Sequence, residues 1–333
     1  MSWFERLTGI EERSPEHVRS QLDLEGETLI FRANGQRWQA GRLETPSLGD
    51  LRERVGQLDL PTGRLRIKEV VADARELHAD PDNANALFQV ASQFNLLEMI
   101  GPDRTPEHGI GIYEHDPTQG PVCAIAAGAG TIYRNYLVPV NGRTGQSEDN
   151  QIDCLADLGE ALGNQGQCLW TMRNGYALAT ESGLADIAGQ LERASESERD
   201  ELRARLRIGL QWNTQVTVPG SEHTVSQAYC SALPVAYSDI PQNQWEPFAR
   251  LVLEASYEAV ILAGLLNYQV TGDPRIYLTL IGGGAFGNRN EWVGDAIEQA
   301  IEQHRDSGLD VQIVSYGRSQ AVVTELIKRV EQR

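Results

Sequence analysis

Residues 276–288 read IYLTLIGGGAFGN, and an amphipathic segment begins shortly afterwards, at Glu291. The apolar run 276–281 is typical of a buried β-strand, and the three glycines that follow end it. A glycine loop between a strand and a helix suits phosphate, because no Cβ shields its N–H groups and the helix N-terminus adds partial positive charge. The same residues also suit an ordinary turn, so the rest of the chain must decide between the two interpretations.

The C-terminal part of the chain alternates predicted helices and strands. A helix is expected over residues 244–268, a strand over 276–281, a helix over 291–305, a strand over 311–316 and a helix over 319–332. This order builds a parallel sheet covered by helices on both faces, and such sheets bind ligands at the carboxyl ends of their strands. The predicted fold class is therefore α/β.

The N-terminal part supplies further strands. A hairpin is expected over residues 28–45 around Asn34-Gly35, the preferred type I′ turn pair, and a strand over 64–71 after the turn Pro61-Thr62-Gly63. Another strand is expected over 87–91. The loop 92–121 that follows it and the glycine loop both come after strands, so we expect them to share one rim of the sheet.

The middle of the chain is harder to interpret. A helix is predicted over residues 122–136, a helical patch over 152–162, and a strand over 170–178, where Asn174-Gly175-Tyr176 favours a turn. Ser197 can cap a helix that continues to about residue 207, and a strand-like run follows over 208–218. We expect one domain over 1–333, with an N-terminal extension over 1–60 and an elaborated insertion over 137–240.

Composition limits the function. The chain has 333 residues, 41% of them hydrophobic, so it can bury a sizeable core, and its net charge of −18 disfavours nucleic acid as the main partner. No apolar run approaches the ~20 residues of a membrane helix, and the N-terminus has no signal-peptide pattern, so we expect a cytoplasmic protein with no membrane partner. Four scattered cysteines form no C-x-x-C pair, which disfavours a structural zinc site or a disulfide framework.

Two segments together resemble the macrodomain superfamily, in its microbial poly(ADP-ribose) glycohydrolase-like branch. Residues 90–95 (VASQFN) are similar to the branch's Phe/Val-Ala-Ser-x-x-Asn segment, and residues 282–288 (GGGAFGN) to its Gly-x-Gly-x-Phe-Gly-Asn loop. The similarity covers about 87–136 and 244–330. It implies a three-layer fold with a mixed, mostly parallel sheet and helices on both faces.

The resemblance also implies an ADP-ribose pocket. In that pocket Asn95 hydrogen-bonds the distal ribose, the backbone of Gly282, Gly283, Gly284, Ala285, Phe286 and Gly287 holds the diphosphate, Phe286 lies beside the ribose and Asn288 braces the loop. The segment 71–74 (VADA) looks like the Gly-Asp-Ile-Thr segment of macrodomains, which makes Asp73 a candidate for the adenine amino group; the alternative is an ordinary loop aspartate. Amide side chains both donate and accept hydrogen bonds, as ribose hydroxyls require.

The sequence departs from the branch at its catalytic loop. The Gly-Gly-Gly run and the Gln-Glu-Glu motif are missing, and the nearest counterpart of the glycine triplet is Gln119-Gly120-Pro121. The acid/base role then falls to a carboxyl of loop 92–121, because glycosidic cleavage needs a carboxyl near the bond and no fixed sequence position. The candidates are Glu98 and Asp116, with Glu107 and Glu114 as further possibilities, while the amide of Gln119 can orient a hydroxyl or a water. Each acid also has an ordinary interpretation as a solvated or structural residue.

Other interpretations of the same region remain open. His108, His115, Glu107 and Asp116 contain metal-ligand types, but their spacing matches no established pattern, so no metal and no cofactor is predicted. Cys123 lies in a run of small apolar residues that favours a core position over a nucleophile. Residues 133–136 (YRNY) resemble the branch's Tyr-bearing helix, although packing is the favoured interpretation.

The sequence thus predicts a protein that binds ADP-ribose or an ADP-ribosylated substrate and hydrolyses an ADP-ribosyl linkage. The missing Gln-Glu-Glu keeps a second hypothesis open, a non-catalytic reader or sensor of ADP-ribose or a related nucleotide. A third is a protein that retains the fold without a ligand.

Overall fold

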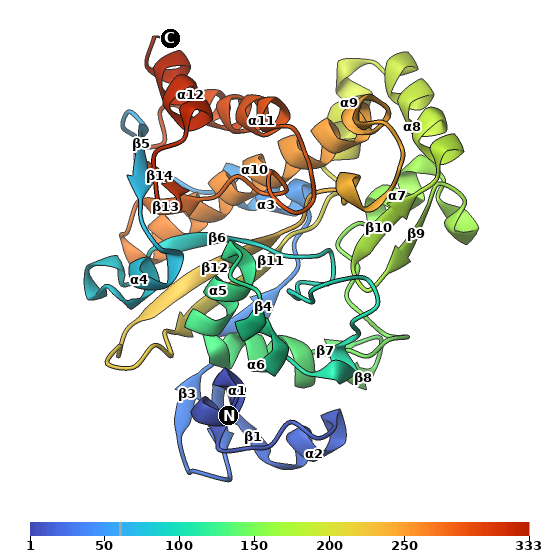
Figure 1. Cartoon of the computed structure of the whole chain (residues 1–333). Coiled ribbons are helices and arrows are strands. Elements are labelled where there is room, and N and C mark those ends of the chain that lie inside the picture. Colours follow the sequence, from blue (N-terminus) through green and yellow to red (C-terminus); the bar gives the residue numbers. More distant parts are fainter. Residues whose placement is uncertain (60–61, 333) are drawn as a thin grey trace.

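The computed structural model describes residues 1–59 and 62–332. Pro61 of the predicted turn and the domain boundary assigned at residue 60 fall outside these ranges. The described chain is built on a seven-stranded sheet of order β4-β11-β12-β6-β13-β14-β5 (Figure 1). Its strands are β4 (Arg42–Glu44), β5 (Arg66–Val71), β6 (Leu87–Ala91), β11 (Gly209–Gln215), β12 (Thr224–Cys230), β13 (Arg275–Leu278) and β14 (Asp310–Ser315).

The sheet is mixed and mostly parallel, which confirms the predicted fold class. Strands β12, β6, β13, β14 and β5 are mutually parallel along the sheet, and β11 runs antiparallel to both of its neighbours. The carboxyl ends of the five parallel strands therefore meet at one edge. The loops after β6 and β13 share that edge, as the sequence predicts.

Helices cover both faces of the sheet (Figure 1). The long helix α10 (Gln242–Thr271) lies on one face against β6, β12 and β13, together with α3 (Leu48–Gly56), α11 (Asn290–Gln303) and α12 (Ala321–Glu331). On the other face α5 (Gln119–Ala126) contacts β6, α6 (Gly128–Tyr136) contacts β11, and α4 (Ala74–Ala79) packs against α5. Helix α10 is mostly apolar and is buried from residue 248 to residue 267 apart from two half-buried positions, Arg250 and Glu254, so it forms the centre of the core.

The helix predicted over residues 122–136 is two helices that meet at Ala127. There the N–H of Gly128 donates to the hydroxyl of Thr217 at 2.9 Å, and the N–H of Thr217 donates to the carbonyl of Ala126 at 2.7 Å. A residue from beyond β11 thus takes hydrogen bonds that a continuous helix would form with itself. The interruption depends on a contact with Thr217, which is distant in sequence, so no local sequence pattern predicts it.

The N-terminal residues form α1 (Trp3–Thr8), α2 (Pro15–Ser20) and an antiparallel sheet of β1 (Leu22–Glu25), β2 (Thr28–Phe31) and β3 (Arg37–Gln39). The predicted hairpin exists as β2 and β3, but residues 42–44 leave it as β4 and join the main sheet. The type I′ turn is wrong: Gly35 has a φ of 70° whereas Asn34 is not among the residues with positive φ, and the N–H of Gly35 bonds to the carbonyl of Phe31 at 2.7 Å across a longer connection.

The segment 137–240 contributes both peripheral and central elements. The peripheral ones are β7 (Pro139–Val140), β8 (Arg143–Thr144), α7 (Ala156–Leu162), β9 (Trp170–Arg173), β10 (Tyr176–Ala179), α8 (Glu181–Arg193) and α9 (Glu196–Arg203). Helix α9 is capped by Ser195 in a capping box with Glu198, two residues before the predicted start. Strands β11 and β12 lie in the main sheet, and β12 was not predicted. No helix of the described residues is long and apolar enough to cross a bilayer.

Candidate functional site

Strands β6 and β13 separate at their carboxyl ends. They pair only through Leu87 and Phe88 opposite Ile276 and Tyr277. Beyond that point the side chain of Gln119 pairs with the backbone of β6, and the side chain of Gln89 links β6 to Thr279, just after β13. Gln119 accepts from the N–H of Ala91 at 2.9 Å and donates to the carbonyl of Gln89 at 2.8 Å. The side chain of Gln89 in turn accepts from the N–H of Thr279 at 3.0 Å. The sheet is thereby held open at this edge.

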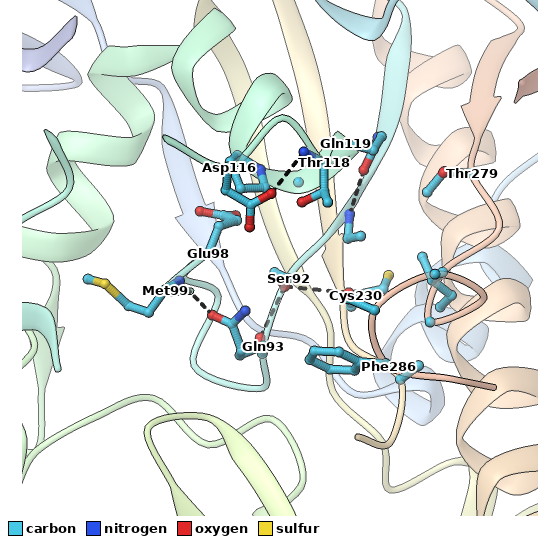
Figure 2. Close-up of a pocket in the computed structure, with 18 of the residues that line it drawn as sticks. Ser92, Gln93, Glu98, Met99, Asp116, Thr118, Gln119, Cys230, Thr279 and Phe286 are labelled. Atoms are coloured by element: carbon cyan, nitrogen blue, oxygen red, sulfur yellow. Dashed lines mark hydrogen bonds between the residues drawn. The ribbon is translucent and has the colours of Figure 1, made fainter. Parts of the chain in front are cut away.

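A cavity of about 250 Å³ occupies the opening. It is lined by the ends of β6 and β12, by loop 92–121, by residues 279–286 and by Tyr176 and Tyr237. Figure 2 shows Glu98 and Asp116 on one side of it and Phe286 on the other. Its volume lies just below the range of about 300–1,000 Å³ usual for ligand sites, so a molecule of dinucleotide size would extend beyond it.

A second cavity, of about 520 Å³, lies at the opposite edge, where Arg42, Arg54 and Trp212 line it beside the amino ends of β6 and β12. Both arginines there are already paired with Glu44, at 3.0 Å each. Ligands of parallel sheets bind at the carboxyl ends of the strands. The smaller cavity is therefore the better candidate site, and it contains residues of both sequence motifs.

The glycine loop presents unpaired backbone donors at this cavity. Within the described residues, the N–H groups of Gly284, Ala285 and Phe286 donate to no protein acceptor. The loop itself is fixed elsewhere: the N–H of Gly287 donates to the carbonyl of Gly284 at 3.0 Å, and the N–H of Ala236 donates to the carbonyl of Phe286 at 2.9 Å. Successive free N–H groups on a fixed loop are the donors that bind an anion.

The glycines of the loop have different reasons to be glycine. Gly282 and Gly287 both have a φ of 72°, and a Cβ on Gly282 would lie 2.4 Å from the Cβ of Ala232. The fold itself therefore requires these two. A Cβ on Gly284 would meet nothing within 4 Å. Gly284 lines the cavity, and packing within the protein does not require a glycine at this position.

Asn288 hydrogen-bonds across the loop. Its side-chain amide is buried and donates to the carbonyls of Leu233 at 2.8 Å and Gly282 at 3.3 Å, while its own N–H donates to the carbonyl of Gly282 at 2.9 Å. Phe286 faces the cavity and belongs to an aromatic cluster with Tyr176 and Tyr237, whose ring centroids lie 5.2–5.5 Å apart. This cluster forms an apolar wall suited to the face of a sugar or a base.

Asn95 lies outside the cavity lining. Its side chain is wholly buried: Nδ2 donates to Gln151 at 2.9 Å, and Oδ1 accepts from the N–H of Leu97 at 3.1 Å. Gln146 also donates to the carbonyl of Asn95, at 3.0 Å. The structure thus gives Asn95 the task of fixing the turn that leads to Glu98. Gln146 and Gln151 come from the segment 137–240, so the sequence motif did not reveal these partners.

Asp73 also lies away from the cavity. It follows β5 and caps α4, with Oδ1 accepting from the N–H of Arg75 at 2.7 Å. This is the ordinary role that the sequence left open for it. The carboxyl end of β5 lies two strands from β13 in the sheet.

Glu98 is the unusual residue of the site. Its side chain is 1% exposed, it lines the cavity, and neither carboxyl oxygen has a hydrogen-bond partner within residues 1–59 and 62–332. Burial raises the pKa of Glu98 to about 8, against the opposing effect of the Arg134 cation. At neutral pH Glu98 is therefore a protonated carboxylic acid, able to donate a proton to whatever occupies the cavity.

Asp116 and Gln119 line the same cavity as Glu98. Asp116 accepts from the N–H of Thr118 at 2.9 Å through one oxygen, which fixes the carboxyl (Figure 2). Gln119 has little freedom to orient a ligand, because its amide bridges the backbone of β6 and also donates to the sulfur of Cys123 at 3.1 Å. The structure therefore brings all three candidate catalytic residues together and gives Gln119 a positioning part.

The remaining candidates lie outside the cavity. The carboxyl of Glu107 accepts from the N–H of Glu148 at 2.8 Å, and that of Glu114 pairs with Arg6 at 3.1 Å. In the described chain no three His, Cys, Asp or Glu side chains converge as metal ligands would. Cys123 is buried, and burial raises the pKa of its thiol well above the usual value. It is a core residue.

Sequence reasoning missed part of the cavity wall. Tyr237 lies on the short helix η5 (Val235–Tyr237), and Cys230 and Ala232 come from β12 and the residues after it. No motif marks these positions. Their place in the cavity wall becomes clear only once β12 is placed beside β6.

Solved structures that are similar in fold include those of microbial poly(ADP-ribose) glycohydrolases. The enzyme from Deinococcus radiodurans in complex with ADP-ribose is 12% identical, with 88% of this chain and 95% of that chain covered and a TM-score of 0.47. The enzyme from Thermomonospora curvata bound to the inhibitor ADP-HPD is 13% identical, with 94% of this chain and 95% of that chain covered and a TM-score of 0.44. No protein-family model and no curated protein matches the chain.

Proposed function

We propose that this protein binds ADP-ribose at the carboxyl ends of β6, β12 and β13 and hydrolyses an ADP-ribosyl glycosidic bond there. One observation carries the proposal. Glu98, a buried carboxyl with a raised pKa and no hydrogen-bond partner for either oxygen among the described residues, lines the same cavity as Phe286 and the free N–H groups of the glycine loop. A general acid and an anion cradle in one pocket are what the cleavage of a phosphorylated glycoside requires.

The binding part of the proposal rests on the glycine loop. The described residues that line the cavity include no lysine or arginine, so the diphosphate would be held by the N–H groups of Gly284, Ala285 and Phe286. A protein of net charge −18 can bind a small anion in this way, whereas the same charge opposes a long phosphate backbone. The distal ribose would then lie between Phe286 and Glu98, and the rest of the ligand would extend outside the cavity.

The chemical part of the proposal uses both carboxyls. The proton of Glu98 passes to the leaving oxygen while the bond between that oxygen and the anomeric carbon breaks, and the electron pair of the bond goes to the oxygen. Water then adds to the anomeric carbon, and its proton returns to the carboxylate of Glu98. Asp116, fixed by the N–H of Thr118, would orient that water. Two carboxyls beside one sugar are the usual arrangement in glycoside hydrolysis.

We also propose a cytoplasmic location. The four cysteines are free, with three of them buried. Unpaired cysteines are typical of proteins from reducing compartments. Preparation of the protein with and without reductant, followed by thiol counting, tests whether all four remain reduced.

Release of free ADP-ribose from an ADP-ribosylated protein tests the activity. The wild-type protein and the Glu107→Gln variant should release it at equal rates, because Glu107 lies outside the cavity. The Glu98→Gln variant should lose at least about 100-fold, the usual effect of removing a general acid. Equal rates for Glu98→Gln and wild type would overturn the assignment of Glu98.

The non-catalytic reader is the second candidate, and the missing Gln-Glu-Glu motif favours it. A reader binds ADP-ribose through the same loop but releases nothing from a modified protein. Calorimetric binding of ADP-ribose by a wild-type protein that shows no release in the assay above would establish this alternative.

A further inference from the structure

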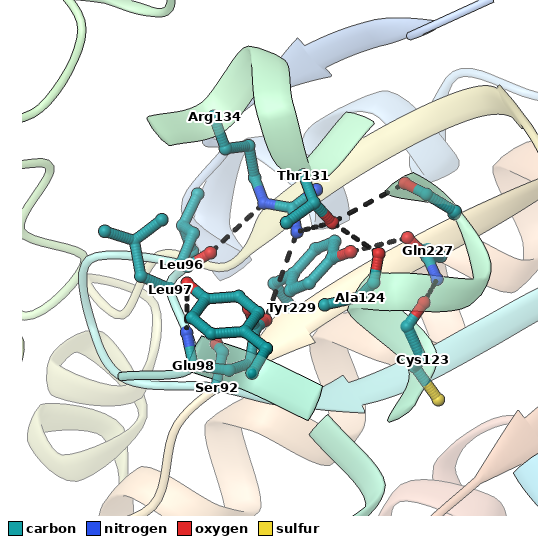
Figure 3. Close-up of polar contacts among 12 residues, drawn as sticks. Ser92, Leu96, Leu97, Glu98, Cys123, Ala124, Thr131, Arg134, Gln227 and Tyr229 are labelled. Atoms are coloured by element: carbon teal, nitrogen blue, oxygen red, sulfur yellow. Dashed lines mark hydrogen bonds and ion pairs between the residues drawn. The ribbon is translucent and has the colours of Figure 1, made fainter. Parts of the chain in front are cut away.

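Arg134 on α6 is a buried cation beside the cavity. Its side chain is wholly buried, and its guanidinium carbon lies 3.6 Å from the centroid of the Tyr229 ring (Figure 3). Stacking on an aromatic face offsets only part of the cost of burying a charge. The N–H groups of a buried arginine therefore also need hydrogen-bond acceptors.

Two nitrogens of Arg134 bond to the protein and one does not. Nε donates to the carbonyl of Leu96 at 3.1 Å, and Nη2 donates to the hydroxyl of Thr131 at 3.1 Å. Nη1 is buried and has no partner in the described part of the chain. Nη2 also lies 4.0 Å from the nearer carboxyl oxygen of Glu98, which is an ion-pair distance and too long for a hydrogen bond.

The bond to Leu96 supports the turn that carries Glu98. Leu96 has a φ of 65°, a left-handed conformation that is strained for a bulky side chain. Such a residue persists only where its surroundings fix it. Arg134 fixes its carbonyl, Asn95 fixes the N–H of Leu97, and Glu98 follows directly.

We propose that Arg134 is the positioning residue for Glu98: it holds the turn that aims this carboxyl into the cavity and stabilises the carboxylate that remains after proton donation. While Glu98 is protonated the two side chains lie apart, and both have unpartnered atoms. Once Glu98 is ionised, the opposite charges attract across the 4.0 Å between Nη2 and the nearer carboxyl oxygen, and a small approach of the two side chains would turn this ion pair into a hydrogen bond. The catalytic consequence rests on the proposed function, but the contact itself does not.

Among residues 1–59 and 62–332, the other titratable groups around Glu98 supply no competing cation. Tyr113 lies on η3 (Gly111–His115), and its hydroxyl accepts from the N–H of Glu98 at 3.1 Å. Burial raises the pKa values of Tyr113, of Cys123 on α5 and of Tyr229 on β12, so these groups are neutral when Glu98 titrates. Asp116 lines the same cavity and is an acid. Arg134 is the cation that acts on Glu98.

Carbon-13 NMR of the glutamate carboxyls, with Glu98 assigned through Glu98→Gln, measures this coupling directly. In the wild-type protein Glu98 should titrate near pH 8. The Arg134→Gln variant removes the charge but keeps an amide donor for Leu96, and its Glu98 should titrate at least about one pH unit higher. In Arg134→Lys, which keeps the positive charge, the Glu98 midpoint should return most of the way to its wild-type value. Arg203→Met, which removes another largely buried arginine paired with Glu254 at 2.8 Å, should leave the midpoint unchanged.

A second readout needs no substitution at Arg134. In the wild-type protein the nitrogen-15 chemical shifts of the Arg134 guanidinium should change with pH, with the same midpoint as the Glu98 titration. In Glu98→Gln these shifts should stay constant. Arg134 resonances that do not change as Glu98 titrates, or an Arg134→Gln variant in which Glu98 titrates like the wild type, would overturn the proposal.

In the release assay Arg134→Gln should lower kcat at least about tenfold and move the alkaline limb of the pH–rate profile to higher pH. If the wild-type protein releases no ADP-ribose, the proposed function fails while the NMR result still decides the coupling.

Discussion

The side chain of Gln119 takes the place of a neighbouring strand beside Ala91, because it accepts the N–H of Ala91 at 2.9 Å and donates to the carbonyl two residues earlier at 2.8 Å. Replacement by leucine keeps the size but leaves both backbone groups unpaired. We expect Gln119→Leu to lower the free energy of unfolding by about 1–3 kcal/mol in urea denaturation. Gln165→Leu, at an exposed position, should change it little; equal effects of the two variants would contradict the role given to Gln119.

Two glycines of the loop should affect different properties when they are replaced: Gly282 the folding of the protein, and Gly284 its binding of ADP-ribose. Gly282→Ala places a Cβ at a positive φ and within 2.4 Å of Ala232, so its melting temperature should fall clearly. Gly284→Val meets open space and should melt like the wild type, yet its side chain would cover the free N–H groups. Calorimetry should therefore show at least about tenfold weaker binding of ADP-ribose to Gly284→Val. Unchanged affinity in this stable variant would rule out the loop as the anion cradle.

Glu12 ties the N-terminal segment to the loop behind Glu98. Its carboxyl accepts from the N–H groups of Ile110 and Gly111 at 2.8 Å each, and from the hydroxyl of Tyr136. Glu12→Ala leaves these donors without an acceptor and should cost at least about 2 kcal/mol of unfolding free energy. Glu11→Ala is the matched control, because the side chain of this exposed neighbour pairs with Arg13 on the surface. A control as damaging as Glu12→Ala would contradict this tie.

The rate of ADP-ribose release should depend on pH through Glu98. The general acid must be protonated, and burial sets its pKa at about 8. The rate of the wild-type protein should be level below that pH and fall about tenfold for each pH unit above it. A stopped assay across pH 6–10 checks this, and a limb that begins near the ordinary glutamate pKa would argue against Glu98.

Because of its raised pKa, Glu98 should also make the free energy of unfolding depend on pH. Unfolded Glu98 loses its proton near 4.5, whereas folded Glu98 keeps it up to about 8, so unfolding releases a proton between these values. The free energy of unfolding should fall as pH rises through this window, by about 1 kcal/mol per pH unit from this group, and level off above pH 8. This slope should be absent from Glu98→Gln and should therefore remain in the difference between the wild type and the variant; a difference independent of pH would show that Glu98 does not retain its proton.

The sequence predicts the parts of the fold that local patterns determine. Residues 87–91 form a strand as expected, and the helices and strands from 242 onward lie within a few residues of their predicted positions, because their apolar spacing is regular. Strand β12 was missed because Ser226 and Gln227 interrupt its apolar pattern. In the structure Gln227 is buried and satisfied by His78, by the carbonyl of Cys123 and by Tyr229. His78 and Cys123 are distant from Gln227 in sequence, so a polar central strand cannot be distinguished from a loop beforehand.

The site, like the fold, can be predicted from the sequence only in part. The sequence identifies the glycine loop and the acids of loop 92–121, because residue type alone limits their chemistry. It does not reveal that Asn95 turns inward, since its partner Gln151 comes from a segment without a motif. Nor does it distinguish Glu98 from Glu107, because burial decides which carboxyl keeps its proton.

The most direct measurement is a crystal structure of the Glu98→Gln variant with ADP-ribose. The account predicts the diphosphate on the N–H groups of Gly284, Ala285 and Phe286, with the anomeric carbon beside residue 98 and its oxygen within about 3 Å of the side chain. ADP-ribose bound at the opposite edge of the sheet, or with its anomeric carbon directed away from residue 98, would contradict it.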